Sequence, residues 1–516
     1  MKGAWALQPL NILLITADQW RGDCLSGLGH PAARTPMLDR FAGEATLFAR
    51  HFAQATPCGP SRASLYTGQY AFNHRSIANG TPLDARHTNM ALELGQAGYE
   101  PVLLGYTDTS VDPRTVAPDD PRLRTYEGVL PGFTPHTLLL ESALPWLDHL
   151  AERGYGRLSL EEAYSTPLGA PARWRAEHSE TAFLADRFAS WLDGQKQHRP
   201  WCAHLSFIKP HPPFVAAAPW HEAIDLAAIP APARAADPEA EAAAHPWLAL
   251  ELARPLGKRL PDSATMWPHH LDAATVATLR RVYLGLIAEV DHHIGRCLEL
   301  VRARGDWDRT LIVVTSDHGE LLGDHWMLGK SGFFPQAFHV PLLIRDPLDA
   351  TGWGKRITEF TEHVDIMPTV LERVGRPVPL QCNGRSLSGS LTGEKSPLAR
   401  AAVHYEHDFR DLRATPAGVR LGLEEERCGL AARLDGRTLY VHFSGLPPLC
   451  YDLEADPACL RDRSGDPAYG PVMSAAARGM LDWRMIHADR RLSDARLTSE
   501  GIVGRYDPAP PSAVRT

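Results

Sequence analysis

The stretch QATPCGPSRASLYTG, residues 54–68, places Cys58 and Arg62 at the start of a predicted helix. A cysteine in such a position can be a core residue, a zinc ligand or a thiolate nucleophile. Packing does not explain a cysteine that is followed directly by Gly59 and Pro60, and a zinc site would lack a second thiolate nearby. A phosphatase-type thiolate loop needs a longer spacer than the three residues between Cys58 and Arg62. None of these ordinary roles accounts for Cys58.

Two further pairs of polar residues follow apolar runs that are typical of buried strands. Asp18 and Gln19 end the run NILLITADQ, and Asp317 and His318 end the run LIVVTSDH. The first pair offers oxygen ligands and the second adds an imidazole nitrogen, a combination that suits Mn²⁺, Fe²⁺, Zn²⁺ or Ca²⁺. Either pair alone is more simply explained as a polar strand end. Together they predict a site for one divalent cation.

Asp291, His292 and His293 also combine metal-ligand types, but they lie within one helical pattern at 274–305. Successive residues of a helix point in different directions. We therefore predict that these three side chains lie on the helix surface rather than in a metal site.

The candidate functional residues are spread along a chain in which apolar strand patterns alternate with helical patterns. NILLITADQ, WCAHLSFIKP near 201 and RTLIVVTSDH near 311 are strand patterns, and 274–305 is the clearest helix between them. This alternation predicts an α/β fold with a large, mainly parallel central sheet flanked by helices. In such sheets ligands bind beyond the carboxyl ends of the strands, which is where Asp18, His211 and Asp317 fall.

The character of the sequence changes after residue 376. AAVHYEHDFR and RTLYVHFSG are typical of antiparallel strands, and PVMSAAARGMLDWRMIHADRRL is typical of a helix. We therefore predict a catalytic α/β domain over 1–376 and a smaller α+β domain over 377–516. The last residues, YDPAPPSAVRT, are expected to form an extended tail.

Composition narrows the class of protein. The chain has 516 residues, a formal net charge of −8 and no long basic run, which argues against a nucleic-acid polymer as partner. The apolar run Ile12–Ile15 is too short for a signal sequence or a membrane span. The eight cysteines are scattered without a CxxC pair. We expect a cytoplasmic protein with no membrane contact, no disulfide framework and no structural zinc site.

CGPSR matches the C-x-P-S/A-R signature of the sulfatase family, and ASLYTG continues it as in that family. The order ADQW, CGPSRASLYTG, FIKPHPPF and TSDHGELLGDHWMLGK resembles the sulfatase branch of the alkaline phosphatase superfamily over nearly the whole chain. NHRSIANGTPLDARH, GYTDTSVDPRT, HYEHDFRD and LDWRMIHADRRL resemble, more narrowly, its phosphonate monoester hydrolase and phosphodiesterase subgroup. The resemblance implies the alkaline phosphatase/sulfatase-like fold.

In that family a maturation enzyme oxidises the signature cysteine to formylglycine, whose hydrate is the nucleophile. The resemblance implies that Cys58 has this role here. It also implies one divalent ion, Mn²⁺ or Ca²⁺ ahead of Fe²⁺ or Zn²⁺. The implied ligands are Asp18, Gln19, Cys58, Asp317 and His318.

The resemblance further implies the residues that meet the substrate. Arg62 would hold the hydrated nucleophile, and His211 and Lys330 would bind the transferred group or protonate the leaving oxygen. The remaining substrate-binding residues would be Asn79, Tyr106, Thr107 and Asp108.

Departures from ordinary arylsulfatases bear on the substrate. Those enzymes carry a Gly-Lys-Trp-His segment where this chain has LLGYTDTS, without lysine or histidine, and Asp-Asp where it has Asp18-Gln19. Asp108 adds an acid at a position where the hydrolase subgroup favours threonine. Less positive charge favours singly charged phosphodiesters and phosphonate monoesters over dianionic esters.

The implied function is metal-dependent hydrolysis of phosphonate monoesters and phosphodiesters, with promiscuous sulfatase and phosphatase activity. The alternative is a sulfatase of the arylsulfatase or choline-sulfatase type, because choline sulfatases share the Asp-Gln and Asp-His pairs. A non-catalytic binding protein is disfavoured, since the nucleophile and the ligand set are both present. The subgroup also implies a homo-oligomer, a tetramer, with the tail after Arg491 as its arm.

Overall fold

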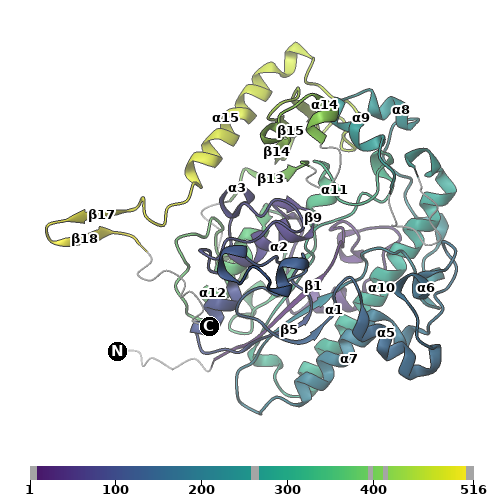
Figure 1. Ribbon diagram of the computed structural model, residues 1–516, viewed down its shortest axis with the longest axis vertical. Coiled ribbons are helices and arrows are strands. Elements are labelled where there is room, and N and C mark those ends of the chain that lie inside the picture. The colour runs from purple at the N-terminus through teal and green to yellow at the C-terminus, as the bar shows by residue number, and fades with distance from the viewer. Residues whose placement is uncertain (1–8, 257–266, 393–398, 411–416, 507–516) are drawn as a thin grey trace.

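The computed structural model describes residues 9–256, 267–392, 399–410 and 417–506. At its centre lies an eight-stranded sheet in the order β11-β2-β10-β8-β1-β7-β5-β6 (Figure 1). Its strands are β1 (Asn11–Ala17), β2 (Thr46–Phe48), β5 (Pro101–Gly105), β6 (Thr134–Leu138), β7 (Cys202–Phe207), β8 (Thr310–Thr315), β10 (Leu342–Arg345) and β11 (Arg356–Ile357). Neighbouring strands are parallel except where β10 is one of the pair. The predicted mainly parallel α/β sheet is confirmed.

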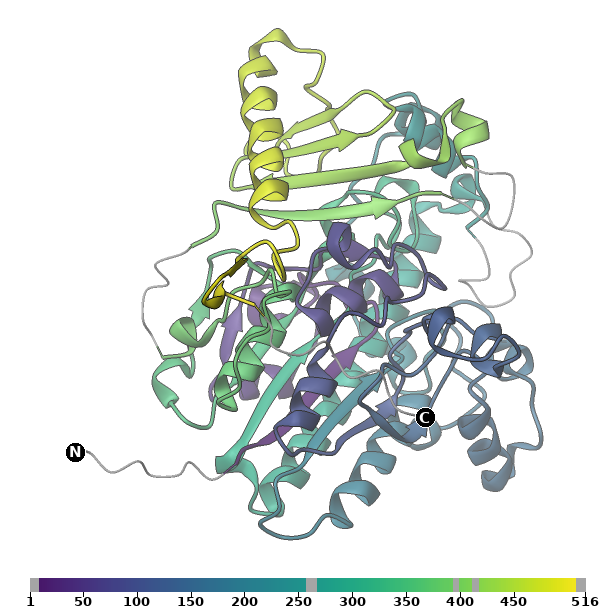
Figure 2. The ribbon, with the colours of Figure 1, turned by 60° about the vertical axis from the view of Figure 1, so that its left-hand side comes forward.

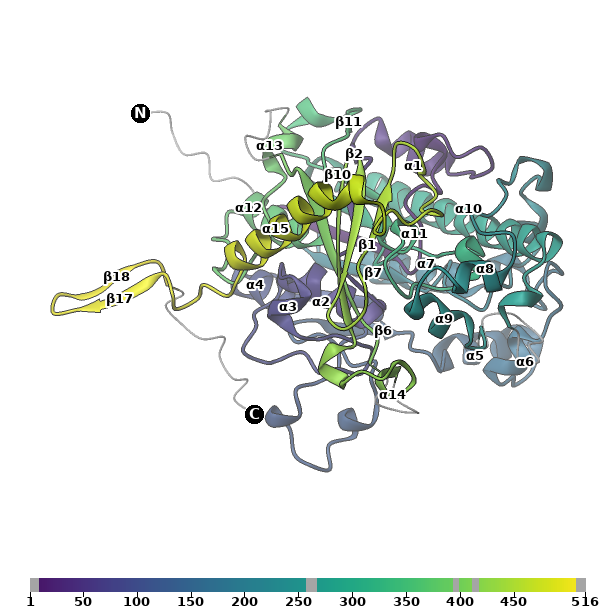
Figure 3. The same ribbon diagram turned by 90° about the horizontal axis from the view of Figure 1, so that it is seen from above.

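Both faces of this sheet are covered, which explains why its central strands are apolar without interruption. Leu13 and Ile15 of β1 belong to one core, and Ile12 and Leu14 belong to the other, because successive strand residues point to opposite faces. Figure 3 shows the helices on either side. The first face carries α1 (Pro36–Ala42), α7 (Glu180–Asp193) and α10 (Ala273–Ala303), and the second carries α2 (Cys58–Thr67), α4 (Met90–Gln96) and α12 (Ile366–Arg373).

Shorter elements complete the catalytic layers. A three-stranded sheet contains β3 (His51–Phe52), β9 (His339–Val340) and β12 (Thr361–Glu362). The remaining helices are α3 (Ala71–His74), α5 (Leu144–Leu150), α6 (Leu160–Tyr164), α8 (Pro238–Ala242), α9 (Pro246–Leu252), α11 (Pro335–Phe338), α13 (Ser388–Leu391) and α14 (Ala417–Leu421). Among the helices of the described ranges, none has both the length and the apolarity that crossing a bilayer requires.

The helix predicted over 274–305 is present as α10, but the surface position predicted for its metal-ligand types is wrong for two of the three. Asp291 and His293 are buried, and only His292 is exposed. The two carboxylate oxygens of Asp291 accept the N–H groups of Met37 and Leu38, at 2.9 and 2.8 Å. Because the first N–H groups of a helix have no partner within it, Asp291 supplies the cap that α1 lacks locally.

We expect Asp291→Ala to lower the free energy of unfolding by about 2 kcal/mol, since it removes a buried cap and leaves two N–H groups unsatisfied. Urea unfolding followed by tryptophan fluorescence measures the change. The control is His292→Ala, one residue along α10 and exposed, which should cost no more than about 0.5 kcal/mol. Equal effects of the two substitutions would contradict a capping role for Asp291.

A five-stranded sheet in the order β16-β15-β14-β13-β4 forms the upper part of the molecule in Figure 2, with α15 (Gly470–Ile486) packed across it. Its strands are β4 (Ala55–Thr56), β13 (Ala402–Asp408), β14 (Gly429–Asp435), β15 (Thr438–Phe443) and β16 (Leu449–Asp452). Strand β4 comes from far earlier in the chain, and its Thr56 pairs with His407 of β13. The smaller sheet therefore holds the two residues that lead into Cys58.

After α15 the chain forms a hairpin of β17 (Ala495–Thr498) and β18 (Gly501–Gly504), which extends away from the body in Figure 1. The part of the tail that follows Arg491 is thus a hairpin and not a simple extended strand. Most of the predicted extended tail, residues 507–516, lies outside the described residues. The hairpin carries apolar side chains into solvent, with Leu497 84% and Ile502 49% exposed.

Candidate active site

The predicted site residues gather at one edge of the large sheet, where its parallel strands end. Thr16 of β1 lies opposite Ser206 of β7 and Thr315 of β8, so these strands end at the same level. Asp18 and Asp317 follow β1 and β8 immediately beyond this level. The sheet register therefore brings together two carboxylates that are 299 positions apart in the sequence.

Tyr106 reaches the same edge because it follows Gly105, the last residue of β5. Gly105 has a φ of 106°, and a Cβ atom there would lie 2.1 Å from the backbone oxygen of Ser206. Only glycine fits this close approach of β5 to β7. The glycine thus sets the position of the loop that carries Tyr106, Thr107 and Asp108.

Cys58 is the first residue of α2, directly after the β4 segment and Pro57. The next N–H group, that of Gly59, donates to Oδ1 of Asn79 at 2.9 Å. A Cβ atom on Gly59 would lie 3.2 Å from that oxygen and from the backbone oxygen of Asp108, so the glycine lets both loops approach the helix start. The partial positive charge of a helix N-terminus favours an anion at this end of α2.

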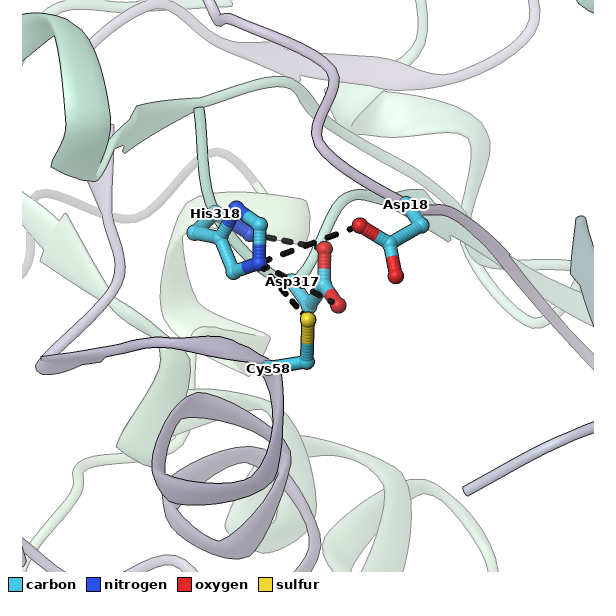
Figure 4. A group of neighbouring side chains, drawn as sticks. All are labelled: Asp18, Cys58, Asp317 and His318. Atoms are coloured by element: carbon cyan, nitrogen blue, oxygen red, sulfur yellow. Dashed lines mark hydrogen bonds and ion pairs between the residues drawn. The ribbon is translucent and has the colours of Figure 1, made fainter. Parts of the chain in front are cut away.

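Four side chains from three elements converge beside this helix start. Donor atoms of Asp18, Cys58, Asp317 and His318 all lie within 4.8 Å of one another (Figure 4). Nε2 of His318 is 3.2 Å from Sγ of Cys58 and 3.8 Å from Oδ1 of Asp18. The other ring nitrogen, Nδ1, lies 3.0 Å from the carbonyl oxygen of Gly319. Since a carbonyl only accepts, Nδ1 donates and Nε2 presents its lone pair to the cluster.

The cluster has the features of a cation site. Asp18 is 1% exposed, yet neither of its carboxylate oxygens has a hydrogen-bond partner. Burial, together with the charge of Asp317, raises the pKa of Asp18 to about 8. Buried carboxylates without partners are costly. A divalent cation would satisfy these oxygens and offset the repulsion between the two acids, so the donor set fits such an ion.

Arg62 anchors the carboxylate of Asp317. Its Nε donates to Oδ2 of Asp317 at 2.9 Å, and Nη1 donates to Oγ of Ser206 at 3.0 Å and to the carbonyl of Tyr106 at 3.2 Å. The guanidinium also lies 4.0 Å from the centre of the Tyr106 ring. Burial would raise the pKa of Asp317, but His318 and Arg62 outweigh it and hold that pKa well below its ordinary value. Asp317 is therefore ionised and fixed in orientation.

Lys330 and Gln19 complete this side of the cluster. The ammonium of Lys330 donates to Oε1 of Gln19 at 2.8 Å and lies 3.2 Å from Sγ of Cys58. The backbone N–H of Gln19 donates to Oδ1 of Asp317 at 3.0 Å. Burial and the charge of Asp18 nevertheless raise the pKa of the Cys58 thiol well above its ordinary value. An unmodified Cys58 would thus stay a neutral thiol, which is a weak nucleophile.

His211 lies in a half-buried loop after β7. Its Nδ1 is 2.7 Å from the carbonyl of Pro212, so Nδ1 donates and Nε2 keeps a lone pair. Burial, with the nearby charges of Lys330 and Lys209, holds the pKa of His211 well below its ordinary value. The imidazole is therefore neutral and can accept a proton.

The side chain of Thr107 is bonded to a neighbouring backbone segment and not to the metal-ligand cluster. Its hydroxyl donates to the carbonyl of Gly128 at 3.0 Å and accepts the N–H of Leu130 at 2.9 Å. Both bonds tie the loop after β5 to the segment that follows it in the fold. The neighbours Tyr106 and Asp108 are also buried, at 7% and 5% exposed.

Several supporting residues were not predicted from the sequence. The buried Lys209 donates to the carbonyls of His211 and Pro213, at 3.1 and 3.2 Å. These two bonds fix the backbone of the His211 loop. The signal was available, since Lys209 stands two residues before His211 in a proline-rich stretch. Glu320 accepts the side-chain amide of Gln19, and its place two residues after His318 was likewise visible.

A pair of buried histidines, His51 and His363, holds the backbone carbonyl of Asp317 in place. Nε2 of His363 lies 3.0 Å from the carbonyl of Asp317, so it donates, and Nδ1 must accept from Nε2 of His51 at 2.9 Å. No pattern in the sequence links His51 to His363, because they lie 312 positions apart.

A cavity of about 570 Å³ lies on another side of the α2 start, between α3, the smaller sheet and α15. Thr56, which precedes the signature, and Pro60, which belongs to it, line this cavity, but none of the predicted site residues does. Its volume therefore does not identify the catalytic pocket.

Residues 10–376 match the sequence profile of the family described as Sulfatase. The chain belongs to the sulfatase family. A relative from Trinickia caryophylli, described as multifunctional alkaline phosphatase superfamily protein PehA, is 38% identical over 509 residues, which cover 96% of this chain and 99% of that protein. Choline-sulfatase of Rhizobium meliloti is 26% identical over 503 residues, covering 94% of this chain and 88% of the relative.

Two solved structures extend this sulfatase-family match to the three-dimensional level. The crystal structure of phosphonate monoester hydrolase of Agrobacterium radiobacter is 43% identical, with a TM-score of 0.93 over 96% of this chain and 100% of the other. Phosphonate monoester hydrolase from Silicibacter pomeroyi is 40% identical, with a TM-score of 0.90 over the same shares. The predicted family and the predicted alkaline phosphatase/sulfatase-like fold are confirmed.

Membership of the sulfatase family implies a divalent metal and a formylglycine at the signature cysteine. The buried group of Asp18, Cys58, Asp317 and His318 is compatible with both. The identity of the metal belongs to the proposal that follows.

Proposed function

We propose that this enzyme hydrolyses phosphonate monoesters and phosphodiesters, with formylglycine derived from Cys58 as the nucleophile and weaker activity on sulfate and phosphate esters. The observation that carries the proposal is the full-length likeness to two phosphonate monoester hydrolases, at 43% and 40% identity. The absence of a lysine or histidine from the segment LLGYTDTS also supports it, because sulfate-binding cations are missing there.

The proposed metal ligands are Asp18, Gln19, residue 58, Asp317 and His318, and the proposed ion is Mn²⁺ or Ca²⁺. When bound, the ion would supply positive charge for the nucleophile and for the transferred group. The side chains of Arg62 and Glu320 would fix Asp317 and Gln19 in the orientation that binding needs.

The proposed proton transfers divide between two residues. Burial lowers the pKa of Lys330, but the nearby acids, Asp18 and Asp317 among them, outweigh burial and raise that pKa above its ordinary value. Lys330 is thus protonated and is the proposed donor to the leaving oxygen; the neutral His211 is the proposed acceptor, a weak base because its pKa is low. We thus propose distinct roles for two residues whose roles the sequence alone left open.

The substrate oxygens would be bound by Asn79 and Tyr106. Since Oδ1 of Asn79 accepts from Gly59, its amide NH₂ group is oriented as a donor. Arg62, which is bonded to Asp317, would stabilise the nucleophile through its positive charge. We give Thr107 the role of holding its loop, because its hydroxyl bonds to the loop backbone.

We expect p-nitrophenyl phosphodiesters and phosphonate monoesters to have higher kcat/KM values than the matching sulfate or phosphate esters. The buried acid Asp108 and the missing lysine and histidine disfavour a dianion most, by about a few kcal/mol per unit charge in a partly desolvated site. Steady-state rates with one phosphodiester, one phosphonate, one phosphate and one sulfate provide the measurement. The alternative function, a sulfatase, is supported by the choline-sulfatase relative. A sulfate ester that leads the panel by about tenfold would establish that alternative.

We also propose a homo-oligomer, a tetramer, in which the hairpin after Arg491 contacts another copy. An isolated two-stranded hairpin is at best marginally stable, and this one exposes Leu497 almost fully, as does the segment before it with Leu492. Light scattering should therefore report a multiple of 56.8 kDa. A chain that ends at Arg491 should form an assembly with fewer copies. A full-length protein that scatters as a 56.8 kDa monomer refutes the assembly.

The remaining proposed partners are small-molecule esters and the maturation enzyme that converts Cys58. The cytoplasmic location expected from the sequence stays a prediction.

A further inference from the structure

Asp108 is a buried acid with one carboxylate oxygen that no group of the described residues satisfies. It is 5% exposed, and its Oδ1 has no hydrogen bond. None of the ion pairs within the described residues includes Asp108. The cost of burying an unsatisfied carboxylate is large. A group that is not part of this chain is therefore expected to meet it.

The loop that carries Asp108 is bonded to the segment that carries a second acid, Glu127, because the N–H of Thr109 donates to the carbonyl of Gly128 at 3.2 Å. Burial raises the pKa of Asp108 to about 6. The charges of Arg62 and Lys330 lower this pKa, and the charge of Glu141 raises it. Burial and the charges of Glu141 and Asp108 also raise the pKa of Glu127, to about 7. The hydrogen bond from the N–H of Glu141 to Glu127 joins the third acid to the other two, so the three acids lie on connected segments and repel one another.

The two outer acids are held in place by bonds to their own loops. The backbone N–H of Glu141 donates to Oε1 of Glu127 at 2.5 Å, and the hydroxyl of Tyr126 donates to Oε2 of Glu141 at 2.7 Å. Neither acid forms an ion pair with a lysine, arginine or histidine of the described residues. Asp108, Glu127 and Glu141 thus form a negative wall, which we call the acidic wall.

The negative charge of the acidic wall determines which kind of group can bind to it. The anionic oxygens of a phosphoryl or phosphonyl group would be repelled by it. The metal-ligand cluster does not include any of its members. A positively charged group that donates hydrogen bonds would satisfy the free oxygen of Asp108 and offset the repulsion within the wall.

We propose that the acidic wall binds a cationic substituent of the substrate, so that the preferred esters carry an ammonium group a few bonds from the reacting phosphorus. The inference rests on the proposed function, whose reacting group it places beside Lys330 and Arg62. The preferred substrate is then a zwitterion: its anion lies toward the metal cluster and its cation toward Asp108.

Two phosphodiesters that differ only in this charge test the proposal. They are p-nitrophenyl 2-aminoethyl phosphate and p-nitrophenyl n-propyl phosphate, in which a methyl group replaces the ammonium. The enzyme is expected to prefer the aminoethyl ester in kcat/KM by about tenfold or more. The 2-hydroxyethyl ester separates charge from hydrogen bonding and should fall between the two.

Asp108→Asn should reduce this preference to about twofold or less, because it keeps the shape and removes the charge. Asparagine also tolerates the left-handed backbone of this position, where φ is 51°. Glu127→Gln should reduce the preference by a smaller factor. The matched control is Glu100→Gln, an exposed acid just before the other end of β5, which should leave the preference unchanged.

Equal kcat/KM values for the charged and uncharged esters, or a preference that survives Asp108→Asn, overturn the inference and leave the proposed function intact. If neither diester reacts although residue 58 is converted, the proposed function fails. The inference is then decided by inhibition of the remaining ester activity: O-phosphoethanolamine must inhibit more strongly than propyl phosphate, and equal inhibition overturns it.

Discussion

Cys58→Ala is expected to lower kcat/KM for an aryl phosphodiester by about four orders of magnitude or more, because it removes the nucleophile while every other charge of the site stays in place. The side chain is buried at the start of α2, beside His318 and Lys330 at 3.2 Å. A neutral thiol there has little reactivity of its own, so the unconverted protein should also be nearly inactive. Activity should therefore rise in proportion to the converted fraction.

Mass spectrometry of the peptide around Cys58 measures that fraction, since conversion of CH₂SH to CHO lowers the mass by roughly 18 Da. Protein preparations with different converted fractions should give activities that extrapolate to about zero at no conversion. Cys297→Ala is the matched control, because Cys297 is fully buried in α10 and takes no part in the cluster. Full activity of Cys58→Ala would refute the mechanism, whatever the mass spectrum shows.

Removal of the divalent cation is expected to abolish activity, and Mn²⁺ or Ca²⁺ is expected to restore it. The reason lies in Asp18 and Asp317, two buried carboxylates that repel each other; both oxygens of Asp18 also lack a hydrogen-bond partner. Metal binding should also stabilise the fold, by about 2.7 kcal/mol when the free ion is at a hundred times its Kd. Chelation followed by activity and thermal unfolding measurements tests both effects on one sample.

Asp317→Asn should weaken metal affinity by about tenfold to a hundredfold and lower kcat/KM by about a thousandfold, because it removes one charge from the ligand set and breaks the bond to Arg62. Isothermal titration with Mn²⁺ gives the affinity. Asp308→Asn serves as the control, since this acid stands just before β8 at its opposite end and is 97% exposed. Unchanged metal affinity in Asp317→Asn would remove Asp317 from the ligand set.

Much of the candidate site could be predicted before the structure, because its residues follow local patterns. Apolar runs that end in Asp18 and Asp317 predict strands of a parallel sheet, and parallel strands of one sheet end at one edge. The motif around Cys58 predicts a helix start, which α2 provides. These inferences use neighbours in sequence and one general rule of sheet topology, so they need no knowledge of distant contacts.

The errors and omissions have the opposite character. Asp291 was expected on a helix surface, yet it caps α1 across 254 positions of sequence. Thr107 stands beside Tyr106 in sequence, but its hydroxyl bonds to Gly128 and Leu130. In both cases the partner is set by how elements pack, and helical or strand periodicity carries no information about that partner.

The sequence by itself determined the fold class, the strand ends that carry Asp18 and Asp317, and the helix start that carries Cys58. Only the tertiary structure decided which groups satisfy the buried charges. It bonded Arg62 to the carboxylate of Asp317, Lys209 to the carbonyl of His211 and His363 to the carbonyl of Asp317. It left Oδ1 of Asp108 without a hydrogen bond. The physical reason is that backbone periodicity is local, whereas the satisfaction of a buried polar group depends on chain segments brought together by packing.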